Sequence, residues 1–180
     1  MSSGSVDTPS GAPRLAVDLK VVQPRDSRVA LGMAVNYLMT DPAFARLPFG
    51  QWSRVLVGQI NRRHFVFVIE RDKVVGFVGW AFATKAKAEA WLTANRDLSF
   101  ADSKTGEIVL ANVWKASTPA ANRFLVQAFR SVIRGKQMIY TKRFYRDGRI
   151  RPVRVAVNSF VKRHIDRGLS RADVVTAGFN

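Results

Sequence analysis

The chain has 180 residues and no cysteine, which excludes disulfides, thiolate metal ligands and a cysteine nucleophile. It has only two histidines, and no acidic cluster lies beside either of them, so we predict no metal site. It also lacks a run of about 18 apolar residues of the kind that spans a bilayer. The N-terminal residues contain no basic segment followed by an apolar one, which argues against a secretory signal. We therefore expect a cytoplasmic protein with no membrane span.

Acidic residues are scarce: 13 Asp and Glu stand against 29 Lys and Arg, for a formal net charge of +16. The excess is concentrated between Arg123 and Arg167, where 13 basic residues face only Asp147 and Asp166. This window alone carries a net charge of +11. A field of this sign attracts polyanions and acidic proteins. The partner is therefore nucleic acid, an anionic membrane surface, or an acidic protein such as an acyl carrier protein.

Length and a hydrophobic content of 47% predict one globular domain. Its N-terminal part is rich in Ser, Gly and Pro, and such a segment buries too little apolar surface to fold. We expect residues 1–27 to be a mostly disordered tail, residues 28–157 to form the domain, and residues 158–180 to be a basic, helical C-terminal tail.

Hydrophobic periodicity predicts helices and strands in alternation along the domain. A helix should follow the cap at Asp26, and a second should start near Pro48. The predicted strands are 64–69, 74–80, 108–114, 138–145 and 150–157, with helices over 84–95 and about 119–132. Asp147-Gly148 indicates a tight hairpin between the last two strands. This order predicts an α/β fold with a mixed sheet flanked by helices.

Four short segments carry a family resemblance. They are Leu31-Gly-Met-Ala-Val-Asn-Tyr-Leu38, Asp41-Pro-Ala-Phe-Ala-Arg-Leu-Pro48, Val78-Gly-Trp-Ala81 and Val109-Leu-Ala-Asn-Val-Trp114. In this order the chain resembles the hemolysin C-type proteins, which are RTX toxin-activating lysine acyltransferases with a GNAT-like fold. The resemblance covers about residues 28–157. It implies a protein-lysine acyltransferase that takes its acyl group from acyl carrier protein and transfers it to an acceptor protein.

The resemblance fails at the catalytic positions. It places the family's catalytic histidine at Phe44 and its catalytic aspartate at Asn112, or at Ala111 if the register slips by one residue. Neither Phe nor Asn can accept a proton, and general acid–base assistance contributes about 10²–10⁴-fold in rate. One hypothesis is a degenerate member that serves as a binding protein. The other is an active enzyme that uses a different base, such as His64, although His64 is more simply explained as a structural residue.

The resemblance also bears on the acyl donor. GNAT proteins that use acetyl coenzyme A hold its pyrophosphate on a glycine-containing loop, and the equivalent segment here, Lys115 to Asn122, has no glycine. We therefore predict no coenzyme A and no other cofactor. An acidic acyl carrier protein would suit the basic window, and its predicted binding residues are Arg143, Arg149, Arg151 and Arg154.

A nucleic-acid-binding domain is the alternative function. The segment from Tyr140 to Arg154 mixes basic and aromatic residues, as single-strand binders do. No helix-turn-helix, RNP, KH or zinc pattern accompanies it, so this hypothesis rests on charge alone. Three acids near the third strand, Asp97, Asp102 and Glu107, are either candidate bases for a lysine amine or ordinary loop and cap residues.

Overall fold

The computed structural model describes residues 18–145, 147–158 and 162–163. Its elements are β1 (Leu19–Val22), α1 (Ser27–Leu38), α2 (Pro42–Ala45), α3 (Phe49–Asn61), β2 (Phe65–Glu70), β3 (Lys73–Ala83), α4 (Lys85–Ala94), β4 (Ile108–Ala116), α5 (Pro119–Ile133), β5 (Met138–Phe144) and β6 (Ile150–Ala156). No helix in these ranges is long and apolar enough to cross a membrane.

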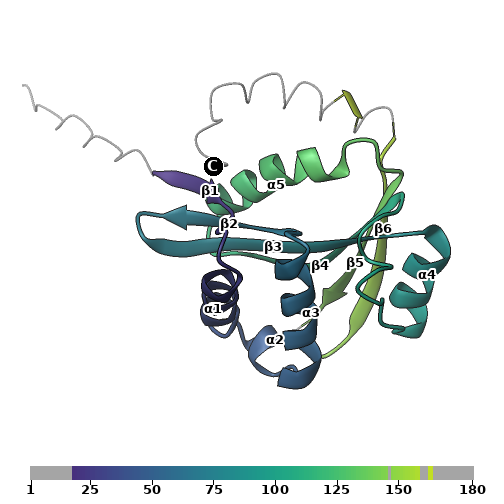
Figure 1. Ribbon diagram of the computed structural model, residues 1–180, viewed down its shortest axis with the longest axis horizontal. Helices are drawn as coiled ribbons and strands as arrows, with labels where there is room; N and C mark the ends of the chain where they lie inside the picture. Colours follow the sequence, from purple (N-terminus) through teal and green to yellow (C-terminus); the bar gives the residue numbers. More distant parts are fainter. Residues whose placement is uncertain (1–17, 146, 159–161, 164–180) are drawn as a thin grey trace, which may run out of the picture.

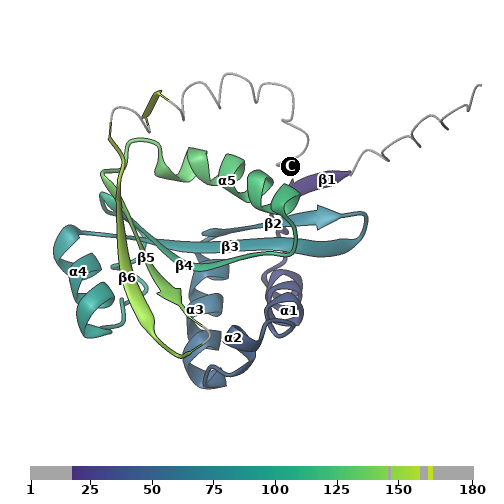
Figure 2. The ribbon, with the colours of Figure 1, turned by 180° about the vertical axis from the view of Figure 1, so that it is seen from behind.

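The six strands form one sheet in the order of the sequence, β1 to β6. Neighbouring strands are antiparallel except for β4 and β5, which run parallel and are connected through α5. Helix α5 covers one face of the sheet, and α1, α2 and α3 lie on the other, with α4 at the far end of that face (Figures 1 and 2). The predicted mixed sheet flanked by helices is confirmed.

The alternation of side chains along β3 divides the core between the two faces. Val78 and Trp80 belong to the apolar cluster beneath α5. Phe77 joins the cluster beneath α1 and α3, and Ala81 joins the one beneath α4. Because both faces of β3 are covered, its central residues form a nearly continuous apolar run, as expected of a buried strand.

Helix starts are capped largely as the sequence predicts. The Asp26 side chain accepts from the backbone N–H groups at the start of α1, and the Thr118 hydroxyl accepts from Ala121 N in α5. Helix α4 follows Thr84 as predicted, but the Thr84 side chain makes no cap hydrogen bond. Instead, Glu107 Oε1 accepts from Lys85 N at 2.9 Å, so the residue just before β4 caps this helix.

Two elements, strand β1 and the short helix α2, are absent from the sequence prediction. Strand β1 pairs with β2 in antiparallel register, from Leu19 opposite Glu70 to Val22 opposite Phe67. The predicted domain boundary at residue 28 is therefore wrong, and the domain begins inside the segment assigned to the tail. Residues 1–17 and most of 158–180 lie outside the described residues, so the predicted disorder and C-terminal helix stay predictions.

Candidate functional site

Strand β4 carries a bulge at the point where it leaves β5. Pairing between β4 and β5 ends at Ala111 and Thr141, where the Thr141 hydroxyl donates to Ala111 O at 2.9 Å. On the other side, Gly79 pairs with Val113 and Trp80 with Ala111, which leaves Asn112 as the extra residue. A bulge re-aims side chains. As a result Asn112 and Val113 both point toward the face that α3 covers.

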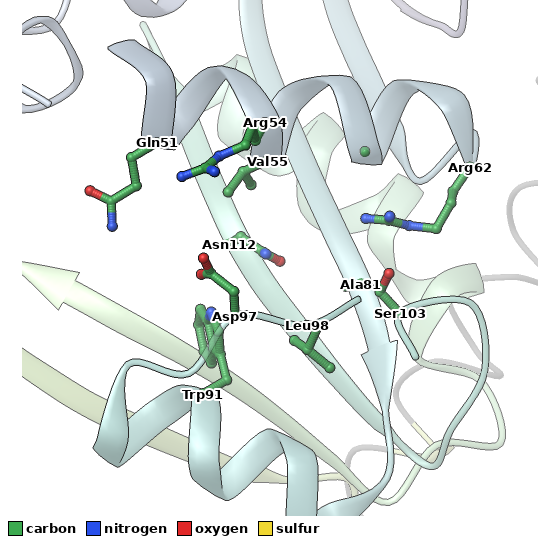
Figure 3. Close-up of a pocket in the computed structure, with 11 residues that line it drawn as sticks. Gln51, Arg54, Val55, Arg62, Ala81, Trp91, Asp97, Leu98, Ser103 and Asn112 are labelled. Atoms are coloured by element: carbon green, nitrogen blue, oxygen red, sulfur yellow. The ribbon is translucent and has the colours of Figure 1, made fainter. Parts of the chain in front are cut away.

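Asn112 lines a cavity of about 190 Å³ beneath α3 (Figure 3). Arg54 and Arg62 reach into it from α3 and its C-terminal end, and Asp97 and Leu98 reach into it from the loop that connects α4 to β4. Polar and apolar side chains share the wall. The cavity therefore suits a ligand with both a polar and an apolar part.

Two buried polar atoms of the cavity lining, Asn112 Oδ1 and Arg62 Nε, have no hydrogen-bond partner in the described part of the chain. Both amide atoms of Gln59 are also unpaired; this residue of α3 is fully buried and does not line the cavity. Gln59 lies against Gly79, where a Cβ would come within 2.4 Å of Gln59 Oε1. Buried polar groups are nearly always paired, so unpaired ones indicate bound water or a ligand.

The cavity is electropositive. Arg54 and Arg62 line it, and Lys142 lies beside it with its ammonium 4.5 Å from the centre of the Trp91 ring. Burial lowers the pKa of Arg62 and that of Lys142, and the nearby Asp97 carboxylate partly opposes the change at Lys142. Asp97 is the only acid among the lining residues.

The other two acids singled out from the sequence have structural roles. Asp102 forms an ion pair with Lys87 at the surface, and Glu107 caps α4. Their partners hold the pKa of each carboxyl below its usual value: for Asp102 the Lys87 side chain is the main cause, and for Glu107 it is hydrogen bonds from backbone N–H groups, including that of Lys85. Neither Asp102 nor Glu107 lines the cavity.

Phe44 lies in the short helix α2, on the same face of the sheet as Asn112. Its ring packs against the α1–α3 cluster, which includes Val113. A half-buried lysine of β4 holds the turn before α2: Lys115 Nζ donates to Tyr37 O at 3.0 Å and to Thr40 Oγ1 at 2.6 Å. Phe44 does not itself line the cavity.

His64 lies on the opposite face of the sheet. Its ring stacks on Trp80, with 5.9 Å between centroids, and contacts the edge of Phe82 at 4.8 Å. Trp80 in turn packs against Phe129 of α5. Burial, with Arg62 and Lys136 nearby, lowers the pKa of His64 to about 4. The structure thus separates His64 from Asn112.

The four predicted carrier-binding arginines belong to the β5–β6 hairpin but differ in their surroundings. Arg154 pairs with Glu89 of α4 at 2.5 Å, and Arg149 pairs with Asp147 at 2.6 Å. Arg143 and Arg151 face each other across the two strands. Like charges placed directly opposite repel each other, and a bound anion would relieve the repulsion.

The structure adds Arg54 and Arg62 to the site, and it buries Gln59 of α3 against Gly79. Sequence reasoning did not single them out, because their place depends on how α3 crosses β3 and β4. Arg62 closes α3 just before the change from helical to strand periodicity, where a surface role is the ordinary expectation. Gln59 alone carries a signal in the sequence, because it is a polar residue on the apolar face of α3, where the helical periodicity predicts a core position.

The comparisons place the chain among acyltransferases. The model of the RTX toxin acyltransferase family (HlyC) matches residues 23–164, whereas no curated protein matches the chain. The loading GNATL domain of CurA from Lyngbya majuscula has a TM-score of 0.52 at 11% identity. That match covers 72% of this chain and 66% of the CurA domain, so the chain spans slightly less than two thirds of that neighbour.

A putative acetyltransferase of the GNAT family from Desulfovibrio desulfuricans is similar at a TM-score of 0.41 and 14% identity, over 85% of this chain and 84% of that one. A TM-score this low carries no argument. The CurA domain supports the fold alone, since its identity to this chain is low. With that match, the predicted GNAT-like sheet is confirmed.

Proposed function

Because the chain belongs to the RTX toxin acyltransferase family, we propose that it is a catalytically weakened member that binds an acyl-loaded acyl carrier protein. One observation carries this proposal: the positions that the resemblance assigns to the catalytic His and Asp hold Phe44 and Asn112. Phe44 packs in an apolar cluster, and Asn112 turns an amide toward the cavity. Neither can take a proton from a lysine amine at neutral pH.

The rival hypothesis of an active enzyme that uses His64 has little geometric support. A general base must lie within hydrogen-bond reach of the proton it removes. His64 lies on the α5 face, with its ring held between Trp80 and Phe82. Arg62 and Lys136, whose charges contribute to the lowered pKa of His64, would also repel the ammonium group of an acceptor lysine there.

The start of α5 supports a carrier protein as donor in preference to coenzyme A. A pyrophosphate binds to free backbone N–H groups at a helix N-terminus. Here Pro119, the first residue of α5, has no N–H group, and the Thr118 hydroxyl accepts from Ala121 N at 3.1 Å. The segment also has no glycine, so the backbone cannot approach a phosphate closely.

We place the carrier on the β5–β6 hairpin, around Arg143 and Arg151. These two guanidinium groups are the ones that an acidic surface helix would neutralise together. Arg149 and Arg154 already have carboxylate partners in Asp147 and Glu89. Their contribution to binding should therefore be smaller.

Catalysis is tested by incubating the protein with acyl-loaded carrier and candidate acceptor proteins, and by measuring acyl-lysine by mass spectrometry. We expect little or no product from the wild type and a gain of about 10²-fold or more from Phe44→His/Asn112→Asp. Robust wild-type turnover that is lost in His64→Ala would overturn the proposal and assign the base to His64.

Carrier binding is tested by isothermal titration with the double variant Arg143→Glu/Arg151→Glu. We expect binding to be lost, while Arg71→Glu/Lys73→Glu in the β2–β3 hairpin, which changes the charge equally, should bind normally. Tight binding of acyl coenzyme A, together with an unchanged carrier affinity in Arg143→Glu/Arg151→Glu, would contradict the assignment.

Nucleic acid remains the second candidate partner. The Tyr145 ring has the guanidinium groups of Arg143 and Arg149 at 5.2 and 5.3 Å from its centre. These cations occupy the ring that a base would need for stacking. Copurifying nucleic acid, seen as a high 260/280 absorbance ratio, together with no affinity for a carrier protein, would favour this alternative.

A further inference from the structure

Arg62 is a partly buried cation without an ion-pair partner in the described part of the chain. Its guanidinium lies 5.2 Å from the centre of the Phe100 ring and over Gly58, where a Cβ would come within 3.0 Å of Nη1. Nε is buried and makes no hydrogen bond. Leaving a buried charge unpaired is costly. An anion that enters the cavity would supply the missing partner.

Asn112 adds a second unpaired polar group to the same cavity. Its Oδ1 is buried without a partner, and rotation of the amide by 180° would present the NH₂ group in its place. The Ser103 hydroxyl, by contrast, already donates to Ser99 O and Phe100 O. Gln51 and Arg54 also line the cavity but are exposed, so Arg62 and Asn112 are the buried groups that an anion would satisfy, and their planar groups suit a carboxylate.

Part of the remaining wall is apolar and offers a surface to a hydrocarbon chain. Val55, Ala81, Trp91 and Leu98 line the cavity (Figure 3). A short aliphatic chain with one carboxylate fits the cavity volume of about 190 Å³.

We propose that the cavity beneath α3 binds a short aliphatic carboxylate, whose carboxylate pairs with Arg62 and Asn112 and whose chain lies against Val55 and Leu98. Arg54 and Lys142 strengthen the positive field, and the one lining acid, Asp97, does not cancel it. A neutral ligand of the same shape binds weakly, and an amine is rejected. The site is separate from the hairpin arginines and does not depend on carrier binding.

The test is a titration of the full-length protein with hexanoate, followed by calorimetry and amide NMR. The controls are hexanamide, which is neutral and of equal size, and hexylamine, which is cationic. We expect hexanoate to bind about tenfold or more tightly than hexanamide, because the neutral amide cannot form the charge-assisted pair with Arg62. Hexylamine should not bind. In the series from acetate to hexanoate, affinity should rise with chain length, because more of the chain contacts Val55 and Leu98.

Two variants locate the binding. Arg62→Gln should weaken hexanoate by about tenfold or more and leave hexanamide unchanged, whereas Arg96→Gln, an equal charge change in the neighbouring loop, should alter neither. Leu98→Trp should exclude all the ligands by filling the cavity, and it tests the site even if Arg62→Gln does not fold. Thermal melting establishes that each variant is folded.

Equal affinities for hexanoate and hexanamide, or full hexanoate binding by Arg62→Gln or Leu98→Trp, would overturn the proposal, as would no binding of any carboxylate. Carrier binding is measured on the same samples. The two proposals are tested separately. Loss of carrier binding with intact hexanoate binding in Arg143→Glu/Arg151→Glu supports the carrier site, and loss of hexanoate binding with intact carrier binding in Arg62→Gln supports the cavity site.

Discussion

Lowering the pH from 7 to 5 should destabilise the protein through His64. The folded protein holds this imidazole at a pKa of about 4, against 6.5 for an ordinary histidine, because the ring is buried near Arg62 and Lys136. The unfolded chain therefore binds a proton between these two values and the folded protein does not. The contribution of His64 to the free energy of unfolding is fully present above pH 6.5, and it is lost as the pH decreases toward 4.

The size of the effect follows from the two pKa values. Taken in full, the difference is worth about 3 kcal/mol, at 1.36 kcal/mol for each pH unit. Solvent reaches part of the half-buried ring, and screening reduces the value by about half. Between pH 7 and pH 5 we therefore expect a loss of about 1 kcal/mol from His64.

Urea unfolding at pH 7, 6 and 5 measures this loss, and His64→Phe is the matched variant. Phenylalanine keeps a ring against Trp80 and Phe82 but cannot take up a proton. The wild type should lose about 1 kcal/mol more than His64→Phe over this range. Equal losses in the two proteins would show that the His64 ring is open to solvent and protonated in the folded state, and the reasoning would be refuted.

Three further predictions concern packing and the α4 contact. Gly79→Ala should lower the free energy of unfolding by about 1–3 kcal/mol in urea titrations, and less in a Gln59→Ala background, because its Cβ would collide with the buried Gln59 amide. Gly106→Ala should cost about 2–4 kcal/mol by the same assay, since Gly106 has a φ of 145° and lies against the Ala83 carbonyl. Glu89→Gln should lower the melting temperature by loosening α4 from β6. Hydrogen bonds from Arg154 and Tyr140 hold the pKa of Glu89 at about 2, so the wild-type contact should persist as the pH falls through 4 and weaken toward 2.

The long elements were predictable because local chemistry determines them. Asp26 caps α1, and the apolar stripe of α3 starts after Pro48 as expected. The turn at Asp147-Gly148 is partly as predicted. Gly148 has a positive φ of 84°, but the strands end at Phe144 and Ile150, so the connection is longer than a two-residue turn.

The features that the sequence did not reveal depend on the register between segments far apart in the chain. Strand β1 is only four residues long and is stabilised by its pairing with β2. The bulge at Asn112 arises from a shift in the register between β3 and β4, which lies between Gly79 and Trp80. The family resemblance identified Asn112 as a substituted position. Sequence periodicity describes one segment at a time, so it could not place Arg62 in the same cavity.

Strand β6 forms one edge of the sheet, and its composition affects how the protein behaves at high concentration. An exposed edge offers unpaired backbone groups to other chains and promotes aggregation. Pro152 has no N–H group to offer, and Arg151 brings positive charge to the same edge, so a second copy is repelled. Neutral replacement of Arg151 should therefore reduce solubility at low ionic strength, whereas replacement by glutamate keeps the edge charged and the protein monodisperse.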